Sequence, residues 1–573
     1  WLRPLSHSSI GGSRSCRHSS AASSTIPEGM GSDTQDAKLA DTLLHTKAGP
    51  SQQKHVYASW ACKGFLTTLL VTGIAAVLLA SNGIPTSTFT KEPVVFYNRS
   101  STWRPPPLNL AATADEDYYW SRRKRDSQST SWAPWTAPSD FSKAPTWTWK
   151  NELNEQVRHS PLIDNEMNIY IVTSSRVRKI TSDGKLLWSW QTTPDEGVMC
   201  VSLTLYKGQV IGVTTAWPDQ LVNRSVGFSL KMSDGSVNWK HVYPYGRIGD
   251  ADAMSVFGGT MIFGVRTNGS AAPDLVLGAS LADGSLLWEY QTDEIFWNFT
   301  PSYVGDGTFI FSSTCGQVQR LSLKGELIWK VGSSAPGQFC SEAGGALGPN
   351  GLFYAQWNQF HDTCGYGPGM PCLPILGDYD GRIAAYQVPD GSLVWERSLG
   401  RRTANYPAVG MLDGRLALIL PVGDQVSFPD TPEKEKAVLL AMPTPGYLTN
   451  AVWAMDATDG SMIWQSEEPK WPYFHGEYED KAAFDKRPAW PPEDICLPDA
   501  QAIPLILGDG TVYAASSHGG WLRAIRDADG NGVIDPSEVS ILSTGACFLN
   551  GPSSAPGMLV AASCWGDVHI FKS

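Results

Sequence analysis

The chain has 573 residues and a formal net charge of −12. Its acidic excess lies in residues 145–573, which carry 29 basic against 46 acidic side chains, whereas the preceding residues are slightly basic. Because an acidic body repels phosphates and anionic headgroups, this distribution argues against nucleic-acid binding and against docking onto a membrane surface.

The first 84 residues predict a tail followed by a membrane anchor. Residues 1–63 are rich in Ser, Ala and Gly without strong hydrophobic periodicity, so we expect a disordered tail. Residues 64–84 contain 21 consecutive uncharged positions, which is long enough to span a bilayer. A buried core helix is the weaker alternative, since no neighbouring segment could cover it. A cleaved signal peptide is the stronger rival, although the run begins 34 residues beyond the first methionine, Met30.

The flanking charges orient this predicted anchor. Lys54 and Lys63 precede the span, and the nearest basic residue after it is Lys91. The bias places the N-terminus in the cytosol, which predicts a single-pass type II membrane protein of the secretory pathway or cell surface. The remainder of the chain would then be lumenal or extracellular.

Glycosylation sequons and cysteines agree with that orientation. Four Asn-x-Ser/Thr sequons and eight of the ten cysteines follow the span. These predict a glycoprotein with disulfide bonds, because N-glycosylation takes place in the secretory pathway and disulfides persist in its oxidising compartments. The sequons are at Asn98, Asn223, Asn268 and Asn298. The cysteines are Cys200, Cys315, Cys340, Cys364, Cys372, Cys496, Cys547 and Cys564, with Cys364–Cys372 the favoured local bridge and no CxxC pair to suggest zinc.

Residues 85–144 are predicted to be a linker, because they are rich in Pro, Ser and Thr and poor in aliphatic residues. Within them Arg122-Arg-Lys-Arg125 has the pattern of a proprotein-convertase site, whose cleavage would shed the following domain. A solvated basic run in a disordered stretch is the alternative, and we favour it.

A short phrase recurs through the rest of the chain: a turn ending in Gly, three mostly apolar residues, then Trp. Six copies end at Trp188, Trp239, Trp288, Trp329, Trp395 and Trp464, with gaps of 51, 49, 41, 66 and 69 residues. Before each, alternating apolar runs such as Met167–Val172 meet Asp-Gly turns, which indicates antiparallel hairpins. Units of this period that bury their faces against each other predict a propeller or solenoid.

One copy carries a family resemblance. Ala454-Met-Asp-Ala-Thr-Asp-Gly-Ser-Met-Ile-Trp464 resembles the tryptophan-docking motif of pyrroloquinoline-quinone (PQQ)-like propellers, with Asp459 where Thr is usual. The resemblance implies eight four-stranded blades over residues 145–573, with each Trp packed against the next blade. It also implies a ring closed by Trp147–Trp149 pairing beside Val568–Phe571, because the last unit lacks its own Gly-x-x-x-Trp strand. Seven blades remain possible if a longer unit is miscounted.

The seventh unit departs from the repeat in a specific way. Ala524 and Gly530 align with the motif, and Ile534 falls at the docking-Trp position. The same stretch matches the twelve-residue EF-hand loop, whose oxygen ligands wrap a calcium ion. The predicted ligands are Asp527, Asp529, Asn531, the Val533 carbonyl, Asp535 and Glu538, with Gly532 at the sharp turn. The flanks read as strands rather than helices, so the predicted role is structural; a polar hairpin turn without metal is the alternative.

The resemblance leaves two functions open. Some family members are calcium- and quinone-dependent dehydrogenases, and others are non-catalytic scaffolds. This chain lacks the adjacent cysteines that the dehydrogenases carry over the quinone, and its calcium loop lies on a hairpin, away from the central axis. We therefore expect no PQQ and a binding module for a protein or glycan, with a quinoprotein oxidoreductase as the runner-up. Polar residues of the long insertions that could line a pocket, although solvation is the simpler reading, are His361, Asp362, His475 and Glu477.

Overall fold

The computed structural model describes residues 118–573 apart from several internal segments. These are residues 200–201, 216–223, 246–253, 266–273, 295–298, 314–315, 333–343, 361–378, 404, 425–439, 441–443, 474–480 and 482–500. The predicted tail, the predicted span at 64–84 and the first part of the predicted linker lie outside the described residues. Among those that are described, no helix is long and apolar enough to cross a membrane.

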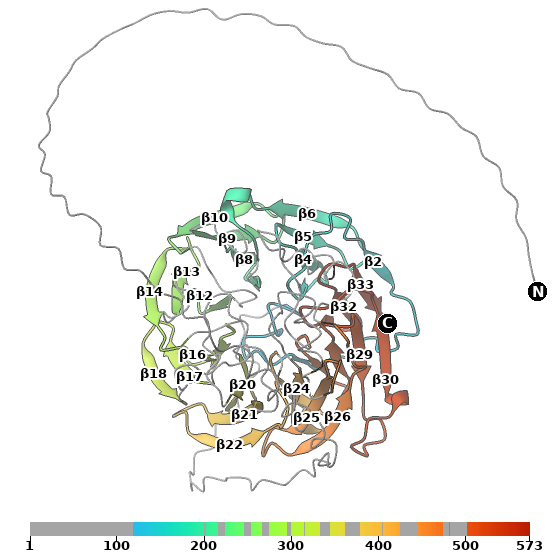
Figure 1. Ribbon diagram of the computed structural model, residues 1–573. Helices are drawn as coiled ribbons and strands as arrows, with labels where there is room; N and C mark the ends of the chain where they lie inside the picture. The colour runs from blue at the N-terminus through green and yellow to red at the C-terminus, as the bar shows by residue number, and fades with distance from the viewer. Residues whose placement is uncertain are drawn as a thin grey trace, which may run out of the picture. The chain divides into compact units, whose positions relative to one another are not determined.

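The described residues form eight antiparallel sheets arranged as the blades of a closed ring, which confirms the eight-bladed prediction and excludes seven (Figure 1). Blade 1 contains β3 (Leu162–Ile163), β4 (Ile169–Val172), β5 (Arg176–Ile180) and β6 (Leu186–Gln191), and blade 2 contains β7 (Thr204–Tyr206), β8 (Gln209–Val213), β9 (Ser225–Lys231) and β10 (Val237–Tyr243). Blade 3 contains β11 (Ser255–Phe257), β12 (Thr260–Val265), β13 (Leu275–Ser280) and β14 (Leu286–Gln291), and blade 4 contains β15 (Ser302–Tyr303), β16 (Thr308–Ser312), β17 (Val318–Ser322) and β18 (Leu327–Val331). Blade 5 contains β19 (Gly345–Leu347), β20 (Leu352–Phe360), β21 (Tyr379–Gln387) and β22 (Leu393–Ser398). Blade 6 contains β23 (Ala408–Leu412), β24 (Arg415–Gly423), β25 (Asn450–Asp456) and β26 (Met462–Glu467), and blade 7 contains β27 (Leu505–Leu507), β28 (Val512–Ala515), β29 (Trp521–Ile525) and β30 (Val539–Ser543). Blade 8 contains β2 (Trp147–Trp149), β31 (Ser553–Ala555), β32 (Met558–Ala562) and β33 (Val568–Lys572). Two short 3₁₀ helices, η1 (Pro194–Glu196) and η2 (Pro536–Glu538), lie between strands.

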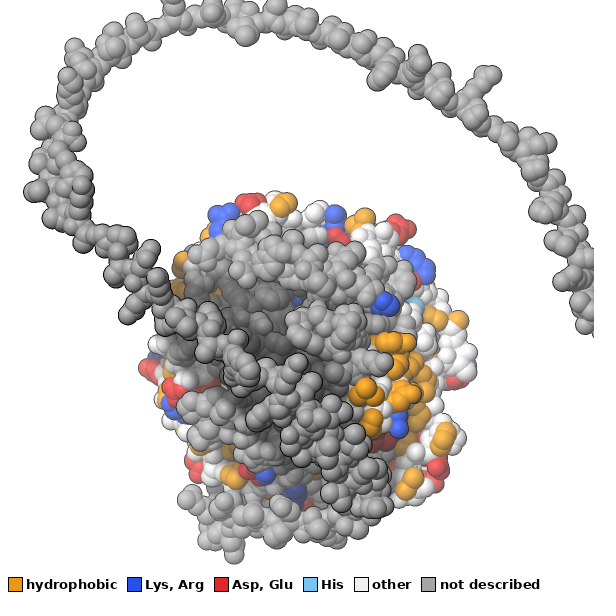
Figure 2. Space-filling view, in the orientation of Figure 1, with side chains coloured by type: hydrophobic (Ala, Val, Ile, Leu, Met, Phe, Trp, Pro, Cys, Tyr) orange, Lys and Arg blue, Asp and Glu red, His pale blue; other side chains and the backbone are white. Residues whose placement is uncertain are grey.

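The burial pattern explains the apolar repeat. The middle strands of a blade are buried on both faces because neighbouring blades cover them, as the almost wholly buried β5 and β12 show. The outermost strands alternate between exposed and buried positions, as in β6. Around the rim in Figure 2, acidic, basic and hydrophobic side chains are intermixed. Exposed aliphatic side chains of the outer strands include Leu187, Val242, Leu287 and Ile328.

The ring closes as predicted. Strand β2 pairs antiparallel with β33, with Trp147 opposite Ile570 and Trp149 opposite Val568. The N-terminal part of the propeller thus supplies the outer strand of the blade whose other three strands end the chain. Because β2 pairs with β33, the edge of β33 is not left exposed where the two ends of the propeller meet.

The docking tryptophans hold successive blades together. With the exception of Trp464, each indole packs on the glycine of the next blade's turn and donates its N–H to a backbone carbonyl there. Trp188 is representative: its ring lies against Gly235, and its Nε1 donates to the Met232 carbonyl at 3.0 Å. Glycine is needed because a Cβ at Gly235, which has φ of +72°, would lie 2.6 Å from the ring. The equivalent donations are Trp147 to Ser182, Trp239 to Leu281, Trp288 to Leu323, Trp329 to Val388 and Trp395 to Ala457.

Blade 7 corrects the alignment of Ile534. Trp464 lies opposite Ala454 in the ladder of blade 6, and the equivalent residue opposite Ala524 in blade 7 is Ser540, not Ile534. The six extra residues of the loop displace the outer strand along the sequence, which simple motif counting misses. Ile534 instead packs into the cluster that contains Trp464.

Phe141 occupies the place of the missing docking tryptophan. Its backbone N–H donates to the Ser540 hydroxyl at 2.8 Å, and its ring centroid lies 6.3 Å from that of Tyr513 and 5.2 Å from that of Phe571. Tyr513 is the counterpart of Tyr170, against which the docking Trp188 packs at 5.9 Å. A residue from the N-terminal segment therefore seals the seam between blades 7 and 8.

Residues 118–144, here called the central segment, contradict the predicted linker. They make backbone hydrogen bonds with the blades in an ordered circuit, and β1 (Trp132–Ala133) joins blade 7 as a parallel fifth strand. Inner-strand N–H groups donate to the segment from Ile163, Leu205, Tyr303, Leu347, Val409 and Ile506 in blades 1, 2, 4, 5, 6 and 7, and the hairpin N–H of Gly557 in blade 8 donates to Thr136. Blade 3 is reached by a side chain, because Arg122 Nη2 donates to the Val256 carbonyl at 3.3 Å.

The basic run lies inside the propeller, so neither a convertase site nor a solvated run describes it. Arg122, Arg123 and Lys124 are at most 2% exposed. Lys124 Nζ donates to the Gly345 carbonyl at 2.6 Å, and Arg123 lies over the Tyr406 ring at 4.7 Å. Residues 118–144 are therefore not a solvated linker, and the burial of the basic run argues against its cleavage in the folded protein.

Candidate functional site

The predicted calcium loop connects β29 to β30 on the outer side of blade 7. Both flanking elements are strands, as expected, and only the short η2 lies within the loop. Gly530 and Gly532 have φ of +71° and +77°, conformations that suit glycine and make the tight turn possible. The loop thus replaces a blade's ordinary hairpin turn without a helix on either side.

Three of the six predicted ligands converge. Oxygen atoms of Asp527, Asp529 and Glu538 lie within 4.8 Å of one another. Backbone N–H groups orient them: Asn531 and Gly532 donate to Asp527 at 3.1 and 2.9 Å. Carboxylates this close repel one another unless a cation lies between them, and oxygen is the ligand atom that calcium prefers.

The other three predicted ligands hold the loop together. Asn531 donates from Nδ2 to Asp529 and accepts the Val533 N–H at its Oδ1, at 2.7 and 2.6 Å. Asp535 caps η2, and its own N–H donates to the Glu538 carboxylate at 2.9 Å. Glu538 also accepts the Ala528 N–H at 2.6 Å, so this one carboxylate joins the two halves of the loop. The donor set and the turn fit a calcium ion.

The loop's negative field extends to blade 6. Asp413, in the β23–β24 turn, is partly buried beside the loop. Burial raises the pKa of Asp413, and the nearby carboxylates of Asp527 and Asp509 raise it further, while Arg526 and Arg415 oppose them. Excess negative charge around a calcium site favours cation binding, so the surroundings agree with the ligand set.

The loop also touches the seam with blade 6. A Cβ at Gly532 would lie 3.0 Å from the Ile463 carbonyl, and Ile534 packs against the cluster around Trp464. By the repeat's geometry, the acceptor for the Trp464 indole would be the carbonyl of Asp527, and the structure records no hydrogen bond there. The seam between blades 6 and 7 therefore depends on the loop rather than on a standard docking turn.

A second polar region surrounds the central segment. Burial lowers the pKa of Lys124 well below its usual range; Asp126 opposes this and Arg123 adds to it. Burial likewise lowers the pKa of His159 to about 3, against a hydrogen bond to Met199 that raises it, and with Arg123 and Arg158 adding to the decrease. Lys124 donates to the Gly345 carbonyl and His159 to the Met199 carbonyl inside the ring. The burial of Lys124 was not predicted because residues 118–144 have the composition of a linker, and no motif in the sequence marks His159.

Other predicted sites lie outside the described residues. They are the insertion residues His361, Asp362, His475 and Glu477, the sequons at Asn98, Asn223, Asn268 and Asn298, and the cysteines other than Cys547 and Cys564. Cys547, which precedes β31, and Cys564, in the turn between β32 and β33, are both buried in one small cluster, and Cys564 is disulfide-bonded.

Comparison with known proteins agrees with this architecture. Residues 146–275 match the sequence model of a family described as outer membrane protein assembly factor BamB. The chain folds as a PQQ-like β-propeller. Comparison with curated protein sequences gives no match.

Solved structures of PQQ-like propellers resemble this one at low identity. The quinohemoprotein alcohol dehydrogenase of Comamonas testosteroni is 12% identical, with a TM-score of 0.52 over 81% of this chain and 82% of that one. Quinohemoprotein alcohol dehydrogenase ADHIIG of Pseudomonas putida HK5 is 12% identical, with a TM-score of 0.50 over 80% and 79%. BamB of Moraxella catarrhalis is 14% identical, with a TM-score of 0.45 over 75% and 97%. At these identities the likeness concerns the fold alone.

Proposed function

We propose that this PQQ-like propeller is a non-catalytic binding or scaffold module, anchored in a membrane and stabilised by calcium on its lumenal or extracellular side. The observation that carries the proposal is the central segment, which occupies the axis and contacts all eight blades. The family resemblance puts quinone chemistry on that axis, and here the chain's own residues are buried there. The absence of adjacent cysteines supports the same reading.

The alternative is a divergent quinoprotein oxidoreductase acting on alcohols or sugars, and the fold likeness to quinohemoprotein alcohol dehydrogenases favours it. The two functions separate on one measurement. Purified protein is incubated with PQQ and calcium, then assayed for bound-quinone absorbance and for dye reduction with ethanol or glucose. The scaffold proposal expects neither signal; turnover that depends on added PQQ would establish the oxidoreductase.

We propose that Asp527, Asp529 and Glu538 supply carboxylate ligands to the calcium ion, and Asn531, Asp535 and the Val533 carbonyl complete the set. A metal that binds only the folded state stabilises it by RT ln(1 + [L]/Kd), about 2.7 kcal/mol at a hundredfold excess over Kd. Millimolar lumenal calcium would give that excess for a site with a Kd of about 10 μM, within the range of such loops.

Calorimetry and melting curves test the calcium site. EGTA should lower the melting temperature of the wild-type protein, and Glu538→Ala should abolish that difference. Glu326→Ala is the matched control, because Glu326 is an exposed carboxylate in the corresponding hairpin turn of blade 4. It should respond to EGTA as the wild type does. Unchanged melting in EGTA, with no calcium-binding heat, would identify the loop as a polar turn only.

The membrane anchor and the partner are tested on the full-length chain. In microsomes, glycosidase treatment should reduce the mass, and external protease should remove only residues before the predicted span at 64–84. Digestion of the propeller in sealed vesicles would reverse the orientation. Co-purification with tagged full-length protein, with and without calcium, would identify a protein partner.

A further inference from the structure

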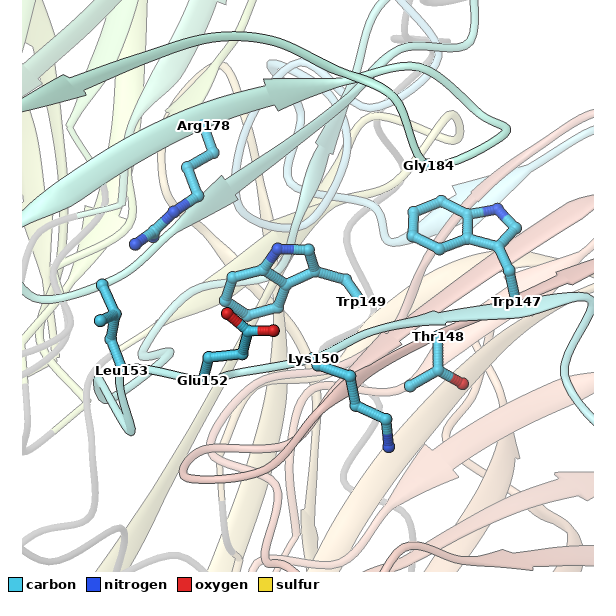
Figure 3. A pocket seen from close by; sticks show the side chains of 8 residues that line it. All are labelled: Trp147, Thr148, Trp149, Lys150, Glu152, Leu153, Arg178 and Gly184. Atoms are coloured by element: carbon cyan, nitrogen blue, oxygen red, sulfur yellow. The ribbon is translucent and has the colours of Figure 1, made fainter.

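A pocket of about 330 Å³ opens on the rim where the ring closes, between blade 8 and blade 1 (Figure 3). It is lined by Trp147, Thr148, Trp149, Lys150, Glu152, Leu153, Arg178 and Gly184. In Figure 3 the Trp149 indole lies in the middle of the lining, with Arg178 and Leu153 on one side and Trp147 beneath Gly184 on the other. The pocket is separate from the calcium loop and from the central segment.

Comparison with the next seam explains why a pocket exists here. Blade 1 carries the same outer-strand phrase, because Trp188-Ser-Trp190 corresponds to Trp147-Thr-Trp149. Trp190 is covered by Phe228, with ring centroids 4.5 Å apart. The residue in register with Phe228 at the closing seam is Arg178, since each directly precedes the strand residue that pairs with a docking tryptophan. The aromatic ring of Phe228 that covers Trp190 between blades 1 and 2 is therefore replaced by Arg178 beside Trp149 between blades 8 and 1.

The two basic groups of the pocket, Arg178 and Lys150, are already paired with carboxylates. Arg178 bonds Glu155 at 2.8 Å and lies 5.3 Å from the Trp149 ring centroid. Lys150 bonds Asp567 at 2.6 Å. An anion would have to compete with these carboxylates, and a cation attracted to the exposed Glu152 would also meet the positive charges of Arg178 and Lys150, so neither charge is clearly favoured over a neutral ligand.

Two lining residues remain available to a ligand. Leu153 is 57% exposed, with the following Asn154 held at a φ of +48°. Glu152 is exposed and makes no hydrogen bond with any described residue. The pocket therefore offers an aromatic ring, an aliphatic wall, a carboxylate acceptor and the N–H groups of Arg178 and Lys150 that their partners leave unused.

We propose that this pocket binds a neutral sugar ring. The C–H face of a sugar can stack on an aromatic ring, and its hydroxyl groups both donate and accept hydrogen bonds without carrying a charge. A pocket of this volume, aromatic at its centre with a few polar groups, is of the size that holds a small ligand. The inference rests on the proposed binding role and names its ligand class and site.

Ligand-observed saturation-transfer NMR on the whole protein tests it with four neutral disaccharides: maltose, cellobiose, mannobiose and diacetylchitobiose. At least one should receive saturation at its ring protons. Trp149→Ala should weaken that binding about tenfold or more, from the loss of one aromatic contact. Trp149→Phe should restore part of it, and Glu152→Gln should weaken it while leaving the melting temperature unchanged.

Trp190→Ala is the matched control, since it removes the equivalent indole at the next seam, where Phe228 covers it, and should leave sugar binding at the closing seam intact. If Trp149→Ala does not fold, Leu153→Asp, on the exposed loop, takes its place and should also weaken binding. Binding of choline or glucuronate in preference to every neutral sugar would overturn the inference, and so would the absence of a saturation-transfer signal from all four sugars at millimolar concentration. Those outcomes leave the calcium and PQQ measurements, and hence the proposed function, untouched.

Discussion

His159 should make the folding stability depend on pH in the mildly acidic range. Its ring is buried just before β3 of blade 1, where Nε2 donates to the Met199 carbonyl at 3.0 Å and Nδ1 accepts from the Ser202 hydroxyl at 3.1 Å. Both nitrogens are engaged by groups that suit the neutral ring, since a protonated Nδ1 could not accept. Burial accordingly lowers the pKa of His159 to about 3.

The magnitude follows from linkage. The unfolded chain binds a proton at a histidine with a pKa of about 6.5, whereas the folded chain does so only near pH 3. Between these values the unfolded state holds more protons, so stability falls as the pH falls from 6.5 towards 3. The slope approaches about 1.4 kcal/mol for each pH unit, which gives a loss of about 2 kcal/mol between pH 7.5 and pH 5.

Urea unfolding at pH 7.5 and pH 5 measures this loss. Other titrating groups also contribute, so the quantity that matters is the difference between wild type and His159→Gln, whose amide can still donate near the Met199 carbonyl but cannot titrate. The wild type should lose about 2 kcal/mol more than the variant across this range. Equal pH dependence in the two proteins would show that His159 is protonated as readily in the folded state as in the unfolded one.

Three further predictions concern how the ring is held closed. Phe141→Ala should cost about 3–5 kcal/mol in urea unfolding because it empties the seam between blades 7 and 8, whereas Lys143→Ala, at a side chain 80% exposed, should change little. A chain that begins at residue 145 should give no folded monomer by circular dichroism and size-exclusion chromatography, since the inner strands lose their partner; a stable monomer would contradict the central segment's role. Burial alone would raise the pKa of Glu155, but hydrogen bonds from Arg178, Thr173 and Arg176 lower it to about 2, so its stabilisation should be full above pH 4.5 and lost as the pH falls towards 2. Glu155→Gln should reduce that acid dependence, measured by the same urea assay.

The blades and their closure could be predicted from sequence because the signal is local and repeated. Each Gly-x-x-x-Trp phrase encodes a turn, an outer strand and its contact with the next blade, and six copies average out their individual departures. The predicted calcium loop is also a local pattern, since all its predicted ligands lie within twelve residues; the structure brings Asp527, Asp529 and Glu538 together, and calcium binding itself stays a prediction. The repeat could not predict what happens in blade 7, where Ser540 stands in place of the docking tryptophan. The space that the tryptophan would fill is occupied there by Phe141, some four hundred residues away in the sequence.

The central segment was missed for a related reason. Its composition is that of a linker, and its hydrogen bonds go to strands distributed over the whole chain, so no periodicity marks it. The signal that could have found it is the concentration of aromatic residues on both sides of the basic run, in Tyr118-Tyr-Trp120 and Trp132-Ala-Pro-Trp135. Trp120 is 2% exposed, and disordered linkers contain few aromatic residues.

The features that the repeat alone does not predict lie in, or next to, one continuous stretch of chain. Residues 118–149 provide the central segment, then Phe141 at the seam between blades 7 and 8, and then strand β2, which closes blade 8 and forms the wall of the pocket. The calcium loop lies one seam further on, between blades 6 and 7, and Ile534 packs there against the cluster of Trp464. A ring of near-identical seams is weakest where its repeat fails and where its two ends meet. In this chain those places carry the predicted calcium ligands, the pocket and the contacts of residues 118–149, so we expect binding at either site to change the stability of the closed ring.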